Sequence, residues 1–453
     1  MVDRDNSYKM RAIMHGESNS LDVDNLVGEG VAGTIVKTFQ IDGGLNFGTR
    51  QARLSDCVYR DIKRNWLGPD GQSAYQVNIL LGKVASGNFE AKDSGHHVCE
   101  WFINGPREGM VYSRTTRRTM SQVFERERHS IDSTPVNTRG DRVECNGRDF
   151  FYVNSGDIAF LVCQVPDVFA PSWSKKVSIE YRREFGNIPD NHQREVISEL
   201  VSFFLGRQLL RIGQTTFDKR LTPIYEEAIS PWGSNVVDVC SKPDVPPISY
   251  SDKELGRIED VLNRCLPAYL KIREELRLND VLWRYWIARS MPLGTNIPIL
   301  ASALEVLRNA WFRSYKTKSG GVYMAKKEYS KLISKDISEI EKKLGDRQYA
   351  RRMVTRIELA YNMGNNERTE IFFEEAGIKI GREEIKALKI RNKMIHGDSV
   401  DDDDKIKEII HLWRVYECLF HRTLLKILGY QGNYIDRGTI GLPERGIEEP
   451  SGG

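Results

Sequence analysis

The feature that most constrains the fold is a proline-dense segment, Lys242–Pro247, which holds three prolines in six residues. Such a segment favours neither a helix nor a central strand, because proline lacks a backbone N–H and has a fixed φ. Before it, apolar residues recur with period 2, and after it with period 3.6. The sequence therefore predicts an α+β multidomain chain: a β-rich domain at 1–245, an all-α helical domain at 246–430 and a C-terminal tail at 431–453.

Length and composition agree with this division. A chain of 453 residues exceeds one ordinary domain, and 40% hydrophobic with 28% charged residues is typical of a globular protein. The net charge of +3 neither requires nor excludes nucleic acid. No apolar run approaches a membrane helix and no secretory signal is visible at the start. The lack of a long apolar run predicts no membrane partner. The seven cysteines are scattered and form no CxxC pair, so we expect reduced thiols and a cytoplasmic location.

The first half is expected to be rich in strands, with one helix over 190–207. The expected strands are 31–40, 75–83, 97–104, 109–113, 149–153, 158–165, 176–181, 209–212 and 221–224.

Two patterns in this half resemble known sites but lack the required context. Gly28–Gly33 matches GxGxxG, yet it follows a polar, acidic stretch and precedes β-branched residues. A dinucleotide site needs a strand before it and a helix after it, so a turn between strands is favoured. His96, His97 and Cys99 have no second ligand pair at metal-site spacing.

The second half predicts a bundle of long helices. Ser251 with Glu254 forms a capping box that begins the first helix, and Pro267 is expected to kink or divide it. Further helices are expected over 280–290, 297–316, 325–344, 347–363, from 382 onward and over 405–428. The glycine-rich end, 446–453, is expected to be disordered.

Polar residues that can contact a phosphate gather at the end of the helix that begins at Arg382. Ile385, Leu388, Asn392 and Ile395 form one helical stripe, so Asn392 interrupts an apolar face. His396 follows Asn392 by four residues and shares its face if the helix continues. Arg391 lies about 100° to the side.

Here the chain resembles a known family. The sequence Arg391-Asn392-Lys393-Met394-Ile395-His396, followed by glycine, is similar to the RxxxxH motif of HEPN domains, most of all the Apea-like branch of prokaryotic antiviral defence. Arg391 and His396 fill the motif, and Asn392 matches its frequent polar residue. The resemblance covers about 251–430. It implies a helical HEPN ribonuclease that acts as a homodimer in antiphage defence or abortive infection, with an N-terminal domain that senses a phage-derived or other trigger.

The motif supplies the groups needed to cut RNA without a metal or cofactor. The 2′-hydroxyl attacks the adjacent phosphate and leaves a 2′,3′-cyclic phosphate and a 5′-hydroxyl. Histidine can act as base or acid near neutral pH, and arginine matches phosphate oxygens. The reaction moves two protons while one motif offers one histidine, so two copies facing each other are expected to complete the site. Arg391, Asn392 and His396 are therefore the predicted catalytic residues.

Four other residues are predicted to assist at the substrate. Glu305 is expected either to orient Arg391 or to face solvent, and Lys393, Arg351 and Arg352 are candidate phosphate contacts whose alternative is a solvated helix face. Asp401–Asp404 precede the last helix, where acidic residues are also favoured by the helix dipole; no metal site is predicted. The rival functions are a HEPN module that binds nucleotide or RNA without cutting, and a motif with a purely structural role.

Overall fold

The computed structural model divides into two compact units, joined near the proline segment. Unit 1 comprises Met1–Pro246 and Tyr250–Leu266, and unit 2 comprises Pro247–Ser249 and Pro267–Gly453. Helix α4 (Arg257–Ile272) begins in unit 1 and ends in unit 2. Of the two expected effects of Pro267, a kink or a division, the division does not occur, because the helix runs through Pro267 as one element. The structure describes residues 2–4, 9–17, 39–44, 51–66, 73–106, 111–113, 127–129, 135–137, 149–165, 176–231, 236–250, 257–314, 322–395 and 403–452.

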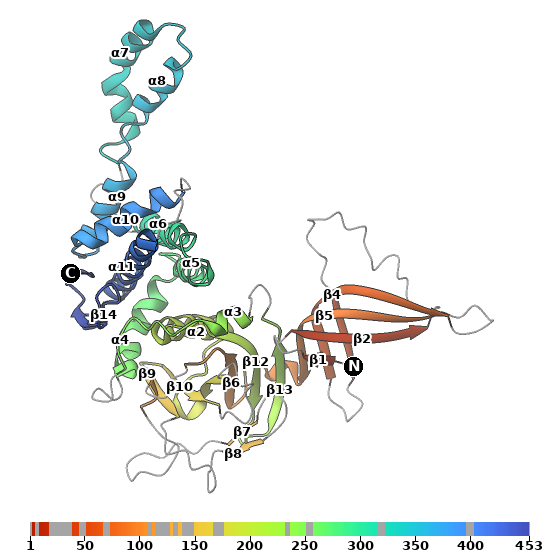
Figure 1. The fold of residues 1–453 in the computed structure, drawn as a ribbon. Coiled ribbons are helices and arrows are strands. Elements are labelled where there is room, and N and C mark those ends of the chain that lie inside the picture. Colours follow the sequence, from red (N-terminus) through yellow and green to blue (C-terminus); the bar gives the residue numbers. More distant parts are fainter. Residues whose placement is uncertain are drawn as a thin grey trace. The chain divides into compact units, whose positions relative to one another are not determined.

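Unit 1 is built on an antiparallel sheet of eleven strands within the described ranges (Figure 1). Its main path runs β1-β2-β5-β13-β12-β6-β11-β10-β9, and β3 joins through β4, which pairs with β5. The strands are β1 (Val2–Arg4), β2 (Met10–Glu17), β3 (Phe39–Gly44), β4 (Gln51–Trp66), β5 (Ser73–Gly87), β6 (His97–Ile103), β9 (Phe150–Ser155), β10 (Ile158–Gln164), β11 (Lys176–Arg182), β12 (Leu210–Phe217) and β13 (Pro223–Ile229). A separate short pair is formed by β7 (Glu127–His129) and β8 (Pro135–Asn137).

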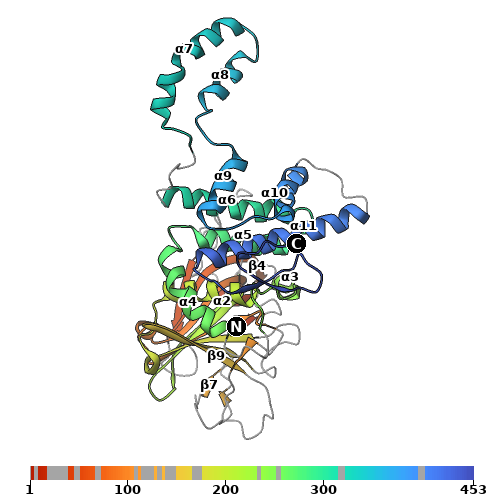
Figure 2. The same ribbon diagram turned by 90° about the vertical axis from the view of Figure 1, so that its left-hand side faces the viewer.

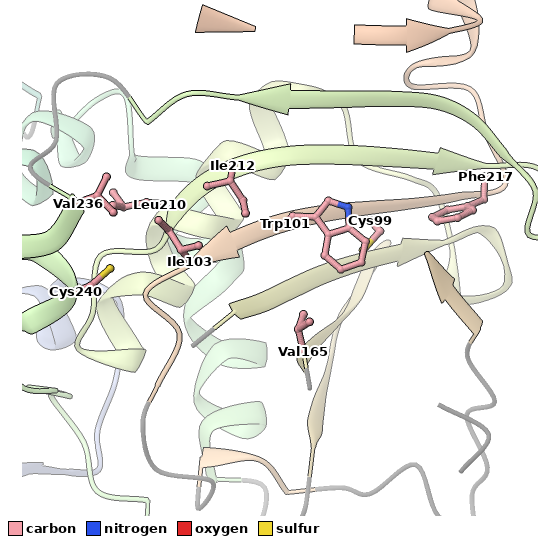
Figure 3. Packing of buried hydrophobic residues seen from close by; sticks show 9 residues of the cluster. All are labelled: Cys99, Trp101, Ile103, Val165, Leu210, Ile212, Phe217, Val236 and Cys240. Atoms are coloured by element: carbon pink, nitrogen blue, oxygen red, sulfur yellow. The ribbon is translucent and has the colours of Figure 1, made fainter. Parts of the chain in front are cut away.

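One face of the central strands packs into an apolar cluster (Figure 3). Cys99, Trp101 and Ile103 alternate along β6, as period 2 requires. Leu210 and Ile212 of β12 join them. Phe217 of the same strand also joins them, although strict alternation from Leu210 and Ile212 would turn an odd-numbered residue to the other face. The register shift between Arg211 and Gly213 explains the change, because an extra residue turns later side chains to the other face.

Helix α2 (Asn191–Leu205) contributes a fully buried arginine to this sheet. Arg194 donates to Glu100 Oε1 of β6 at 3.3 Å and to Gln214 Oε1 of β12 at 3.2 Å. The helix begins with a capping box between Asp190 and Gln193, as its local sequence favours. Burying a guanidinium without such partners would be costly, so Arg194 fixes α2 to β6 and β12.

Unit 2 is helical. Its elements are the end of α4, α5 (Leu278–Ser290), α6 (Asn296–Ser314), α7 (Lys326–Leu344), α8 (Ala350–Glu358), α9 (Asn365–Glu375), α10 (Arg382–Ile395) and α11 (Asp403–Ile427), with a hairpin of β14 (Asn433–Ile435) and β15 (Glu444–Gly446). Helix α6 packs on α5, α9, α10 and α11, and so it lies at the centre of the bundle. Helices α7 and α8 pack on each other and stand apart from α10 in both views (Figures 1 and 2).

The coarse prediction of a strand-rich N-terminal region and a helical C-terminal region is confirmed. Several details were wrong. The long strand β4 was not predicted, and 111–113 do not form the expected strand. The helix expected over 347–363 ends at Glu358, and α9 was missed. The expected strand over 31–40 falls largely outside the described residues, as does the expected turn at Gly28–Gly33.

Residues 446–452 are ordered, contrary to the disorder predicted for 446–453. Ser451 is buried, and its backbone N–H donates to Glu384 Oε1 at 3.1 Å. Arg422 of α11 is fully buried, pairs with Glu384 of α10 and donates to the carbonyl of Ile447 at 3.2 Å. Glycine content indicated disorder, but a buried ion pair that also binds this backbone holds the segment in place.

We expect Glu384→Gln to lower the free energy of unfolding by about 3–5 kcal/mol, because it leaves a buried guanidinium without its counter-charge. Chemical denaturation of the full chain measures this loss. Asp404→Asn is the control, since Asp404 pairs with Lys407 at the surface and such pairs contribute about 0–1 kcal/mol. Equal effects of the two substitutions would contradict the assignment.

A buried histidine on α11 predicts a dependence of stability on pH. Burial lowers the pKa of His421 well below its usual value, and the charges of Arg437 and Arg289 act in the same direction. The neutral ring lies 2.8 Å from the hydroxyl of Tyr285. A folded-state pKa below the unfolded value of about 6.5 means that unfolding takes up a proton at lower pH.

The contribution of His421 is therefore complete above about pH 6.5 and declines below it, by at most about 1.4 kcal/mol per pH unit. Denaturation at pH 7.5 and 5.5 measures this decline. We expect His421→Gln, which does not titrate, to show a smaller difference between the two pH values. A variant with the same pH dependence as the wild type would show that other groups are responsible.

Candidate functional site

The candidate site is centred on Arg391, near the end of α10. Its guanidinium pairs with the carboxylate of Glu305 on α6. The side chains of Arg391 and Glu305 are 25% and 29% exposed, so solvent reaches the pair from one side. Of the two readings of Glu305 left open by the sequence, the structure places it against Arg391.

The structure brings two further arginines to this pair. Arg308 lies one helical turn after Glu305 on α6 and is 4% exposed. Its Nη1 donates to the carbonyl of Asn365 at 3.0 Å and to Thr369 Oγ1 at 2.6 Å, which ties α6 to α9. Arg368 of α9 donates to Asn309 Oδ1 at 3.1 Å, and its guanidinium lies 5.3 Å from the ring centroid of Phe312.

The electrostatics of this cluster favour additional negative charge. Burial lowers the pKa of Arg308, the charges of Arg368 and Arg391 lower it further, and Glu305 opposes them. The Nε atoms of Arg308, Arg368 and Arg391 are buried and have no hydrogen-bond partner within the described parts of the chain. Arg391 thus pairs with Glu305, and Arg308 lies within the influence of the charges of Arg368, Glu305 and Arg391.

A cavity of about 530 Å³ adjoins the cluster. It lies between α6, α9 and α10, with Tyr416 of α11 also in its wall. Burial raises the pKa of Tyr416, so its hydroxyl stays protonated at neutral pH. The volume is within the usual range for small-molecule sites in proteins.

The other predicted site residues are placed as follows. Asn392 and Lys393 belong to α10, and the structure describes their backbone but not their side chains. His396 lies outside the described residues. Arg351 and Arg352 are exposed on α8, which stands apart from α10 in both views, so the structure does not bring them to Arg391 (Figures 1 and 2).

The residues considered as metal ligands in the sequence make other contacts in the structure. His97 is buried and stacks on Phe217 with ring centroids 5.1 Å apart, and His96 lies 3.5 Å from a carboxylate oxygen of Glu184. Asp403 and Asp404 form the first turn of α11, while Asp401 and Asp402 lie outside the description. Among the residues described, no group of three or more His, Cys, Asp or Glu side chains is placed to hold a metal ion.

Sequence reasoning missed Arg308, Arg368 and Tyr416. Arg308 had a signal, since it follows Glu305 by three residues and so shares a helix face with it. Arg368 had none, because α9 itself was not predicted.

Comparisons of the chain with protein-family models, with curated proteins and with solved structures found no match. Within the described ranges, no helix has the length and apolar character needed to cross a membrane.

We expect a double-mutant cycle with Glu305→Gln and Arg391→Gln to give a coupling of about 1 kcal/mol, between the values typical of exposed and buried pairs. Denaturation of the full chain provides the four free energies. The pair Asp404–Lys407, whose side chains are 86% and 75% exposed, is the control and should couple more weakly. A coupling near zero for Glu305 and Arg391 would contradict a formed ion pair.

Proposed function

We propose that this chain is a metal-independent endoribonuclease of the HEPN type, with Arg391, Asn392 and His396 as its catalytic residues. The observation that carries the proposal is the ion pair between Arg391 and Glu305. It supports a positioned, partly exposed guanidinium at the end of the helix that leads into the Arg-Asn-x-x-x-His motif.

In the proposed reaction, the 2′-oxygen of a ribose forms a bond to the adjacent phosphorus and the bond from phosphorus to the 5′-oxygen breaks. The 2′-hydroxyl gives its proton to a base, and the departing 5′-oxygen receives one from an acid. Arg391 stabilises the negative charge of the phosphorane, and His396 carries a proton. Glu305 positions Arg391, while Asn392 and Lys393 orient the phosphate.

The need for two proton carriers leads to the proposed homodimer. Each motif supplies one histidine, so His396 of one copy acts as base and the same residue of a second copy acts as acid. A substrate that reaches such a site must be single-stranded or looped, because in-line attack requires freedom of the backbone at the cut.

The proposed setting is antiphage defence by cleavage of RNA in the infected cell. A fully active ribonuclease would harm its own host, so the cleavage rate in the absence of a trigger must be kept low. We assign this control to the β-rich unit 1, which would respond to a phage-derived or other trigger. This assignment rests on the family resemblance rather than on a residue of unit 1.

The alternative is a HEPN module that binds nucleotide or RNA without cutting it. The cavity of about 530 Å³ beside Arg391 favours this candidate, since it offers space for a ligand without requiring chemistry.

We expect wild-type protein in EDTA to cut a labelled RNA stem-loop and to leave 2′,3′-cyclic phosphate ends. His396→Ala should reduce the rate by at least about 100-fold, the usual contribution of a general acid or base. His411→Ala is the control, because His411 lies on α11 and contacts Glu383 rather than Arg391.

Equal cleavage by the wild type and His396→Ala would contradict the catalytic assignment. RNA binding by both proteins with no cleavage by either would favour the binding module.

A further inference from the structure

The cavity beside Arg391 has an apolar wall. Phe372 of α9, Ile378, and Ile385 and Leu388 of α10 line it. The side chain of Ile385 is 43% exposed. The apolar surface at this cavity therefore remains accessible to a ligand.

Another part of the cavity wall is charged. Glu305, Arg308 and Arg391 line the same cavity. Two exposed carboxylates and two exposed lysines on the rim offset one another: Glu370, Glu374, Lys379 and Lys389. Arg308 and Arg391 against Glu305 leave the lining with a net positive charge, and Arg368 adds the charge of a further guanidinium near Arg308.

This combination selects the chemistry of the ligand. An anionic group near Arg308 and Arg391 would balance guanidinium charge that Glu305 alone does not neutralise. A flat apolar group would cover the exposed part of Ile385 and Leu388. A nucleotide has both parts, and the cavity of about 530 Å³ has room for one.

We propose that the cavity between α6, α9 and α10 is a base-binding subsite, which holds one unpaired nucleotide of the RNA with its base against Ile385 and Leu388 and its phosphate at Arg391. The inference rests on the proposed function, and it adds how the substrate is chosen. An RNA is then cut beside a nucleotide that can leave its stack, and the shape of the cavity sets which base is preferred.

The test measures binding of small probes to the full-length protein. The probes are the four ribonucleoside 3′-monophosphates, the matching nucleosides and inorganic phosphate, each titrated by calorimetry. We expect at least one nucleotide to bind ten-fold more tightly than its nucleoside and than phosphate, because only the nucleotide fills both parts of the cavity.

Ile385→Trp should weaken that binding at least ten-fold by filling the apolar part. Ile410→Trp is a matched control, because Ile410 is also an isoleucine on a helix of unit 2, is 36% exposed and does not line the cavity. Circular dichroism of both variants confirms folding. Nucleotide binding that is absent, no tighter than that of phosphate, or unchanged by Ile385→Trp would overturn the proposal.

Measuring RNA cleavage by Ile385→Trp distinguishes failure of the subsite from failure of the proposed nuclease. Cutting that depends on His396 but keeps its rate and position in Ile385→Trp would overturn the subsite and retain the nuclease. Nucleotide binding that Ile385→Trp abolishes, in a protein that cuts no RNA, would retain the cavity as a nucleotide site and refute the nuclease.

Discussion

The position of α10 depends on a fully buried ion pair between Glu384 in its first turn and Arg422 of α11. The same carboxylate accepts hydrogen bonds from the backbone of Gly381 and Ser451, at 2.9 and 3.1 Å. Near the other end of the helix, Arg391 pairs with Glu305 of α6. Two carboxylate–guanidinium pairs thus fix α10 between its neighbours, one buried and the other open to solvent. The open pair lies next to the proposed site, where a phosphate can compete for the guanidinium.

The sequence predicted those parts of the fold that follow from local periodicity. The sharp change of period at Lys242–Pro247 located the transition from strands to helices, and the stripe through Ile385 and Leu388 located α10. The prediction for the C-terminal segment was wrong because contacts between residues distant in the sequence determine its structure. The C-terminal segment has the composition of a disordered tail, yet it is ordered by Arg422 and Glu384, which precede it by 20 residues or more.

The candidate site was also predictable only in part. The motif residues could be found from their spacing, and Glu305 could be named because a carboxylate beside an apolar stripe suggested a partner. The arginine cluster and the cavity could not be found, because they depend on how α9 packs on α6 through Arg308 and Thr369. Such packing joins residues that are 61 positions apart, and no local pattern encodes it. In the proposed function, the cluster supplies buried positive charge close to the motif.

The central claim is that the motif at the end of α10 promotes attack by a 2′-hydroxyl on the neighbouring phosphate. The most direct measurement compares cleavage of an RNA at its mapped cut with cleavage of the same RNA carrying a single 2′-deoxyribose there, in EDTA. We expect this one substitution to abolish cutting at that position and to leave binding of the RNA intact. Continued cutting at the deoxy position would show that the nucleophile is not the 2′-hydroxyl and would contradict the mechanism.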